Sequence, residues 1–236
     1  MPDEERMGRR GAAGKGRRLA WGRGTALAAL LVLPGACLHR SPLLEPRQQE
    51  LYAQAPDSFR VAVETSRGRF VVAAHRDWAP SGVDRFYYLV NHHYYDGVRF
   101  FRVIKGFVVQ FGINGDPKVA ATWRALPIAD DRVRQSNRRG TISFASAGPN
   151  TRTVQLFINL VDNRRLDSLG KVGFMPIASV VEGMPVVDSL YSGYGEAAPR
   201  GKGPSQDSLT RQGNAYLSRA FPQLDSIVTA RIERVW

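Results

Sequence analysis

One arginine lies within a run of mostly apolar and aromatic residues. The run extends from Phe100 to Gly112 and reads as a strand, a Lys-Gly turn and a second strand, with Arg102 on the first strand and Gln110 on the second. A guanidinium carries five N–H donors and keeps its positive charge at neutral pH, so it can stabilise electron density without giving up a proton. Arg102 and Gln110 are therefore candidate site residues, although an arginine among aromatic rings can also simply lie over them at the edge of a core.

A second block of polar and aromatic residues runs from Phe144 to Asn159. It contains a Gly-Pro-Asn-Thr turn at 148–151, followed by a predicted strand. Successive side chains of a strand point to opposite faces, so Gln155 and Phe157 share one face with Asn159, and the apolar residues between them share the other. The pattern predicts one apolar face and one mixed polar and aromatic face.

The counts of cysteine and histidine exclude several kinds of site. Cys37 is the one cysteine of the 236 residues, so the chain forms no internal disulfide and no four-cysteine zinc site. None of the four histidines lies beyond residue 93, which excludes a downstream histidine-based triad and a His-Glu-x-x-His metal site. We expect His92-His93 and Asp130-Asp131 to be solvated pairs at a helix end and in a loop.

The elements that would position these residues are mainly short strands. Helical spacing predicts helices that begin at Pro80 and Met184 and another over 209–220, while 113–140 and 192–207 are long polar connections expected to be functional or mobile. A hydrophobic content of 43% is enough for a core, and many short strands with few helices favour an antiparallel sandwich or barrel. The predicted strands cover 59–65, 69–75, 98–104, 107–112, 141–145, 155–160 and 226–233.

The two blocks together resemble the signature of the cyclophilin family of peptidyl-prolyl isomerases. Residues 100–110 match its Phe-x-Arg-[Val/Ile]-Ile-x-Gly-Phe-x-x-Gln strand pair, and 145–158 match its Ala-x-Ala-Gly-Pro-Asn-Thr loop with the following Gln-x-Phe-Ile strand. Arg165-Leu166-Asp167 and the stretch 180–188 follow in the family's order. The resemblance spans 59–191 and implies a mainly β fold, a closed eight-stranded antiparallel barrel capped by helices, with the site on its outer face.

The resemblance also implies roles for single residues. It assigns catalysis to Arg102, Gln110 and Phe107, and substrate binding to Val108, Ala145, Ser146, Gln155, Phe157 and Leu166. The aromatic and aliphatic members would form a proline pocket, Gln110 and the backbone of Ser146 would hold peptide carbonyls, and Gln155 would support the arginine. We expect proline-containing polypeptides as partners, a monomeric chain, and neither cofactor nor metal.

These residue types suit rotation about X–Pro bonds. Resonance opposes rotation of a peptide bond with a barrier of roughly 18–20 kcal/mol. The two X–Pro isomers differ by only about 0.5–1 kcal/mol, yet they exchange over tens to hundreds of seconds. In the twisted bond the proline nitrogen regains its lone pair, so a guanidinium placed there binds the transition state more tightly than the planar bond. Such chemistry requires no histidine, cysteine or carboxylate pair.

Several positions depart from the family pattern. Phe101 stands where the family commonly has histidine, and Arg165 stands where it has Trp or Phe before Leu-Asp. The pocket histidine of eukaryotic members has no counterpart, and Phe174 or Lys171 would fill its place. These changes bear more on cyclosporin binding, which we expect to be weak, than on isomerase activity.

The first 36 residues read as an export signal. Seven basic and three acidic residues accompany an apolar run at 26–33, which is shorter than a membrane-spanning helix, and small residues follow. Cys37 after Gly35-Ala36 resembles a bacterial lipoprotein signal, in which that cysteine becomes lipidated; cleavage without lipidation and an uncleaved anchor are the alternatives. We expect residues 1–36 to be a signal peptide, 37–57 a tether, and 58–236 a cyclophilin-like domain with an extension at 192–222. The protein would be exported, and either anchored to the membrane through Cys37 or released into the periplasm or outside the cell.

Two other functions fit parts of the sequence. A cyclophilin-like module could bind proline-containing segments as a chaperone or scaffold without useful catalysis. Phe101 and Arg165 favour this alternative, whereas the presence of Arg102, Phe107, Gln110 and Phe157 favours catalysis. Nucleic-acid binding is the other alternative. It is suggested by the net charge of +12 and by the loop arginines Arg134, Arg138 and Arg139. No nucleic-acid motif accompanies this charge and the export signal argues against such a partner, so we expect none.

Overall fold

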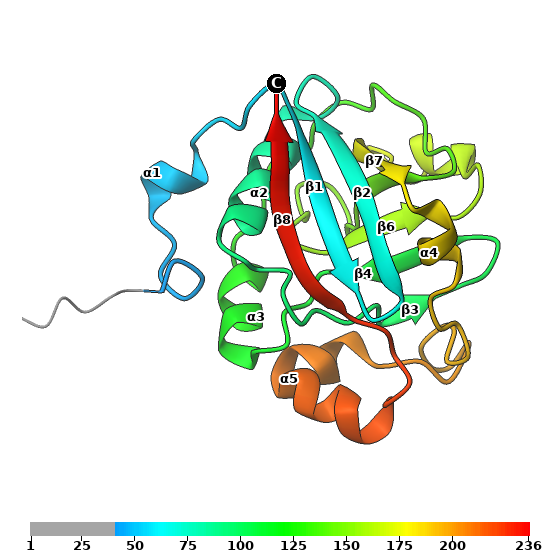
Figure 1. The fold of residues 1–236 in the computed structure, drawn as a ribbon. Helices are drawn as coiled ribbons and strands as arrows, with labels where there is room; N and C mark the ends of the chain where they lie inside the picture. Colours follow the sequence, from blue (N-terminus) through cyan, green and yellow to red (C-terminus); the bar gives the residue numbers. More distant parts are fainter. Residues whose placement is uncertain (1–40) are drawn as a thin grey trace, which may run out of the picture. The chain divides into compact units, whose positions relative to one another are not determined.

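The computed structural model describes residues 41–236, so the predicted signal peptide and Cys37 lie outside the described residues. Its main element is one antiparallel sheet of eight strands in the order β3-β4-β6-β5-β7-β2-β1-β8, with β8 beside β1 (Figure 1). The strands are β1 (Ser58–Thr65), β2 (Gly68–His75), β3 (Arg102–Val103), β4 (Val108–Phe111), β5 (Thr141–Phe144), β6 (Leu156–Asn159), β7 (Pro176–Glu182) and β8 (Ile227–Val235). The mainly β prediction is confirmed, and β7 is a strand that the pattern analysis missed.

The prediction of a closed barrel is wrong, because the sheet is an open half-barrel with edge strands β3 and β8. Between the segment that leads into β3 and the start of β8, the described residues form an isolated bridge from Arg99 to Ser226. Three backbone hydrogen bonds accompany it, from Phe100 N–H to Asp225 O at 3.0 Å, from Gly97 N–H to Ile227 O at 2.9 Å and from Ile227 N–H to Val98 O at 2.8 Å. The predicted strand at 98–104 shrinks to the two residues of β3. A strand this short cannot carry a regular ladder on both sides, so the sheet does not close.

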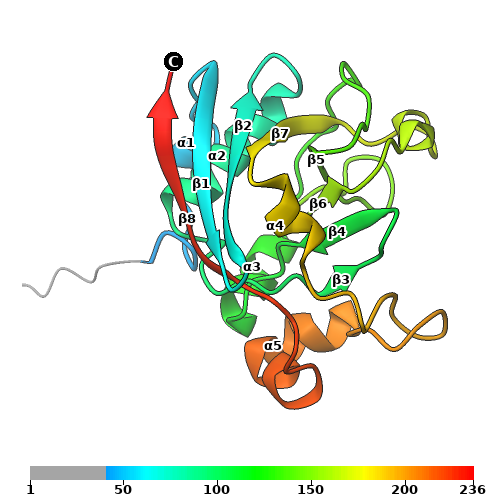
Figure 2. The ribbon, with the colours of Figure 1, turned by 45° about the vertical axis from the view of Figure 1, so that its right-hand side comes forward.

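Helices lie around the curved sheet (Figure 2). The helices are α1 (Gln48–Leu51), α2 (Pro80–Asn91), α3 (Pro117–Arg124), α4 (Met184–Asp188) and α5 (Gln206–Ala220), with a 3₁₀ turn η1 (Arg164–Asp167). Within the long connection expected at 113–140, α3 begins where Asp116 Oδ1 accepts from the Lys118 N–H at 2.8 Å and Pro117 takes the first turn. This Asp-Pro start is a local helix signal that pattern analysis passed over.

The core lies on the concave side of the sheet. Phe59, Val61 and Ile158 are fully buried there with Val83 and Leu89 of α2. The alternation predicted for the strand at 155–160 holds, since its leucine and isoleucine residues enter this core. The opposite faces of β4 and β6 are thereby left to form a separate outer site.

Residues 41–57 contact the domain. The Trp123 Nε1–H donates to Leu43 O at 2.9 Å, and the Ala55 N–H donates to Asp84 Oδ1 at 2.8 Å. The part of the expected tether that the structure describes is therefore packed against the domain. Among residues 41–236, no helix combines the length and apolar character that crossing a bilayer requires.

The extension at 192–222 packs beside the sheet through α5, which lies next to α3 (Figures 1 and 2). Two helical pieces of α5 meet at Gly213, where φ is 61° and ψ is −152°. A Cβ at this position would lie 2.0 Å from Gly115 O, so the close approach of α5 to the loop before α3 requires glycine. A small apolar cluster joins the extension to the domain, formed by Phe101, Ile113, Ala120, Leu209, Leu217 and Leu224.

Candidate active site

The β3–β4 pair brings the candidate arginine and glutamine together. Arg102 and Gln110 are register partners, and Arg102 Nη1 donates to Gln110 Oε1 at 3.0 Å. Gln110 Nε2 in turn donates to Gln155 Oε1 at 2.9 Å. The three side chains form one hydrogen-bonded row that fixes the orientation of the guanidinium from the side of β4.

An apolar cavity of about 240 Å³ opens beside this row. Eight of the nine residues predicted for the site line it, and Leu169 and Phe174 complete it. The lining residues are Arg102, Phe107, Val108, Gln110, Ala145, Ser146, Phe157, Leu166, Leu169 and Phe174. The structure thus brings one cation and one amide to the wall of a small hydrophobic cavity.

The floor of the cavity comes from the outer face of β6. Phe157 is the register partner of Gln110 and is 5% exposed. It packs with Val108 and Leu166, and its ring meets that of Phe174 edge-on with centroids 5.5 Å apart. Of the two alternatives for the missing pocket histidine, Phe174 therefore lies in the cavity, while Lys171 lines a different hollow near Asp167.

The turn that carries Leu166 is held by a neighbouring carboxylate. Asp167 accepts from Ser136 Oγ at 2.5 Å and from both the N–H and the Nδ2 of Asn137 at 2.8 Å. Partial burial opposes ionisation, but these hydrogen bonds together outweigh it and lower the pKa of Asp167. The ionised Asp167 fixes η1 against the 136–137 loop and so positions Leu166.

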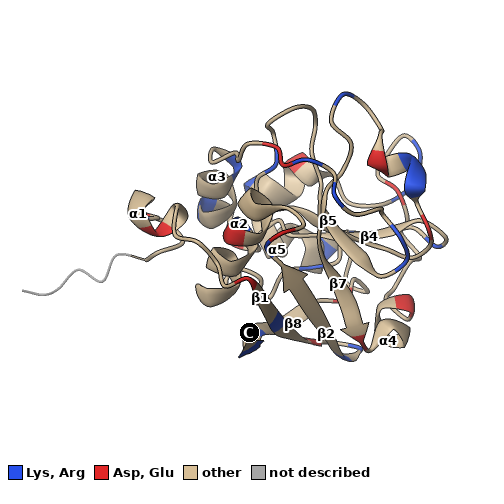
Figure 3. Ribbon diagram, turned by 90° about the horizontal axis from the view of Figure 1, so that it is seen from above, with Lys and Arg blue, Asp and Glu red and all other residues tan. Residues whose placement is uncertain are grey.

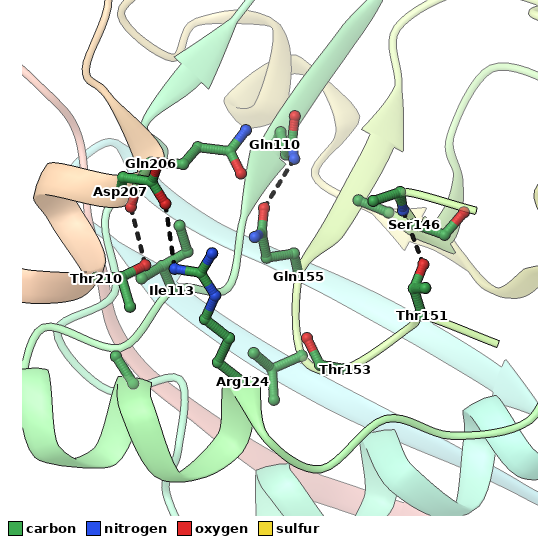
Figure 4. Close-up of a pocket in the computed structure, with 14 residues that line it drawn as sticks. Gln110, Ile113, Arg124, Ser146, Thr151, Thr153, Gln155, Gln206, Asp207 and Thr210 are labelled. Carbon is green, nitrogen blue, oxygen red and sulfur yellow. Dashed lines mark hydrogen bonds and ion pairs between the residues drawn. The ribbon is translucent and has the colours of Figure 1, made fainter. Parts of the chain in front are cut away.

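Gln155, the ninth predicted residue, lies in an adjacent cavity of about 470 Å³ (Figure 4). Gln110, Ala145 and Ser146 line both cavities, so the two cavities lie side by side at these residues. The far wall belongs to α3 and to α5 of the extension, where Arg124 and Asp207 form an exposed ion pair at 3.1 Å.

Glu196 is a site residue that the sequence analysis missed. Its Oε1 accepts from Arg102 Nε at 2.9 Å and its Oε2 accepts from Arg102 Nη2 at 2.7 Å. Hydrogen bonding to the Arg102 guanidinium holds the pKa of Glu196 below its ordinary value. Glu196 lies in the connection predicted at 192–207, but its spacing gives no sign of a partner 94 residues earlier.

The two departures from the family pattern, Phe101 and Arg165, lie in different surroundings. Phe101 is buried in the cluster that anchors α5 and does not line the cavity. The guanidinium carbon of Arg165 lies 5.2 Å from the centroid of the Phe107 ring, and that of Arg102 lies 5.7 Å from it. Phe101 is thus explained by the packing of the extension, and Arg165 places a second cation over Phe107, which lines the cavity.

The expectation that Asp130 and Asp131 are solvated is wrong. Both carboxylates are buried beside Arg152, with Asp131 Oδ2 3.0 Å from its Nη2 and Asp130 Oδ1 3.2 Å from its Nε. Asp131 also accepts from the Ser81 and Gly82 N–H groups at the start of α2, both at 3.0 Å. Arg152 thereby ties the second signature block to α2.

Basic and acidic residues are both spread over the described part of the ribbon (Figure 3). In the loop that suggested nucleic-acid binding, Arg139 pairs with Asp188 at 2.6 Å and Arg134 donates to Asp77 O at 2.7 Å. Within residues 41–236, no cluster of three metal-ligating side chains is present.

Comparisons with known proteins identify the family of this chain. The family described as cyclophilin type peptidyl-prolyl cis-trans isomerase matches residues 60–208. The chain is 39% identical over 140 residues to peptidyl-prolyl cis-trans isomerase A of Dickeya dadantii, covering 58% of this chain and 73% of the relative. It is 35% identical over 136 residues to peptidyl-prolyl cis-trans isomerase B of Escherichia coli, covering 55% of this chain and 82% of the relative.

Solved structures share the fold. A Cryptosporidium parvum cyclophilin type peptidyl-prolyl cis-trans isomerase superimposes with a TM-score of 0.54 at 21% identity, covering 75% of this chain and 98% of the other. The same parasite enzyme in the presence of the dipeptide Ala-Pro gives a TM-score of 0.53 at 20% identity, covering 74% and 99%. From the match over 60–208 and the identity to the bacterial relatives, the chain belongs to the cyclophilin-type peptidyl-prolyl cis-trans isomerases.

Proposed function

We propose that this chain accelerates cis–trans rotation of X–Pro bonds in exported polypeptides and so assists their folding. The observation that carries the proposal is the Arg102 guanidinium, held by Gln110 at the wall of an apolar cavity floored by Phe157. A prolyl ring is apolar and fits such a cavity, while the peptide bond that precedes it would lie near the cation. The curated relatives named as isomerases support the reaction class.

The proposed mechanism is electrostatic. In the planar ground state the nitrogen lone pair is delocalised into the carbonyl, so Arg102 gains little from contact with it. In the twisted state the lone pair is localised and accepts a hydrogen bond from the guanidinium, so binding is stronger in the transition state. Phe107, Val108, Phe157 and Leu166 would hold the ring, and Gln110 with the backbone of Ser146 would hold the flanking carbonyls.

Exchange spectroscopy on a short Ala-Pro peptide tests this function directly. The full chain should accelerate isomerisation, and Arg102→Ala should lower kcat/KM by about 10²-fold or more, as loss of one electrostatic stabiliser does in other enzymes. Both proteins should unfold at similar denaturant concentrations. A folded parent that binds the peptide without accelerating exchange would instead support a proline-binding module without catalysis.

Export and lipid anchoring form a separate part of the proposal. It rests on the basic start, the apolar run at 26–33 and Cys37 after two small residues. Metabolic labelling with a fatty-acid analogue in a bacterial host should mark the parent and leave Cys37→Ser unmarked. A parent that is shortened but carries no label would indicate a cleaved, unanchored protein.

A further inference from the structure

Glu196 contacts the arginine on which the proposed reaction depends, and it comes from the extension rather than from the sheet. The carboxylate binds the guanidinium through two parallel hydrogen bonds, from Nε at 2.9 Å and from Nη2 at 2.7 Å. Both side chains are mostly shielded, with 21% of Arg102 and 25% of Glu196 exposed. Two-point contacts of this kind restrict a guanidinium in both position and plane.

Glu196 and Gln110 contact different N–H groups of the Arg102 guanidinium. Glu196 takes Nε and Nη2, whereas Nη1 donates to Gln110 and lies at the other end of the group. Glu196 does not line the 240 Å³ cavity, although Arg102 does. The carboxylate therefore holds the arginine from outside the cavity without filling it.

The loop around Glu196 is itself held. The Gly203 N–H donates to Glu196 O at 2.7 Å, and Ala197 forms a bridge with Gly203. Beyond this loop, α5 is anchored through Leu209 and Leu217 to Phe101, the neighbour of Arg102. The extension thus contacts Arg102 through Glu196 and Phe101 through α5.

We infer that Glu196 is a positioning residue for Arg102, through which the extension orients the guanidinium toward the X–Pro nitrogen. The inference rests on the proposed isomerase function. A long arginine side chain has many rotamers, and Gln110 by itself would restrain only Nη1. Fixing the group before substrate binds removes this reorganisation from the barrier, so the contribution of Glu196 lies in kcat more than in KM.

The test compares Glu196→Ala, Glu196→Gln and Glu196→Asp with the parent on the Ala-Pro peptide. Glu196→Ala should lower kcat by about tenfold with KM little changed. Misplacing the Arg102 guanidinium slows the reaction, whereas the cavity that binds the prolyl ring stays intact. Glu196→Gln keeps the size of the side chain and should show an intermediate loss, and Glu196→Asp should recover part of the rate. The matched control is Asp188→Asn, which removes another two-point carboxylate contact, with Arg139, away from both cavities.

A pH profile separates positioning from a merely structural role. The charges that face the Glu196 carboxylate are Arg102 from β3 and Arg200 from its own loop. In the parent, kcat should fall as acid protonates Glu196, whereas Glu196→Gln should lack this limb over the range in which both proteins stay folded.

Three results would overturn the inference. They are an unchanged kcat in folded Glu196→Ala, a rise in kcat that would mark Glu196 as an inhibitor of Arg102, or an equal loss in Asp188→Asn. Failure of the proposed function is distinguishable, because it would show as an inactive parent or as an Arg102→Ala variant that keeps the parent rate.

Discussion

Arg102 and Gln110 face each other directly across the β3–β4 pair, and the 3.0 Å hydrogen bond from Nη1 to Oε1 is the link between the cation and the rest of the sheet. Gln110 is 7% exposed and is held in turn by Gln155. The row thus holds the Arg102 guanidinium at the end of a chain of hydrogen bonds that begins within the sheet.

Gln110→Ala should lower kcat/KM by about tenfold, because Arg102 loses its acceptor on the sheet and the substrate loses a proposed carbonyl contact. Gln155→Ala removes the second member of the row and should give a smaller loss. Steady-state isomerisation of the Ala-Pro peptide measures both. Equal losses of kcat/KM in the two variants would contradict the inference that Gln155 acts on Arg102 only through Gln110.

Phe157→Ala should raise KM more than it lowers kcat, since the ring floors the cavity in which the prolyl ring would bind. The residue is buried, so truncation should also lower the free energy of unfolding. The loss is about 3–5 kcal/mol at a fully packed site and should be smaller here, because one side of the ring faces the cavity. Phe157→Leu keeps most of the packing and provides the folded control. If Phe157→Ala unfolds and the folded Phe157→Leu variant keeps the KM of the parent, Phe157 serves only the packing of the core.

Asp131→Ala should destabilise the fold by about 3–5 kcal/mol, because the variant leaves the buried Arg152 with poorer compensation. It also removes the acceptor of two N–H groups at the start of α2. Urea unfolding followed by circular dichroism measures the change. Loss of an exposed pair, as in Asp207→Ala, should cost less than about 1 kcal/mol, and a similar cost at both sites would refute the argument.

The stability contributed by Asp167 should disappear in acid. Its pKa is lowered in the folded state, so its contribution is fully present above the ordinary aspartate value of about 3.9 and is lost as pH falls through the lower folded value. The difference in unfolding free energy between the parent and Asp167→Asn should therefore be largest near neutral pH and shrink below pH ~4. A difference that is constant with pH would show that the ionised form has no special part in holding η1.

Cyclosporin should bind weakly, with a dissociation constant above the micromolar range. Arg165 offers a solvated guanidinium over Phe107 where a flat aromatic residue would offer apolar area. Calorimetric titration measures the affinity, and a sub-micromolar constant would contradict the expectation.

Local patterns in the sequence determined much of the site. Alternation in the strands at 107–112 and 155–160 separates core-facing from outward residues, so the common face of Val108 and Gln110 and that of Gln155 and Phe157 can be read without a structure. The hairpin of β1 and β2, the helix at Pro80 and the last strand likewise follow from periodicity and turn residues close in the chain.

Tertiary structure decided what depends on partners far apart in sequence. Closure of the sheet rests on how β3 meets β8, and the short β3 leaves it open. Asp131 becomes buried because Arg152 reaches it, Phe101 because α5 covers it, and Glu196 reaches Arg102 because the extension returns to the edge of the sheet. A sequence pattern records the polarity and spacing of neighbours, whereas an ion pair across 94 positions arises only when packing brings both charges to one place.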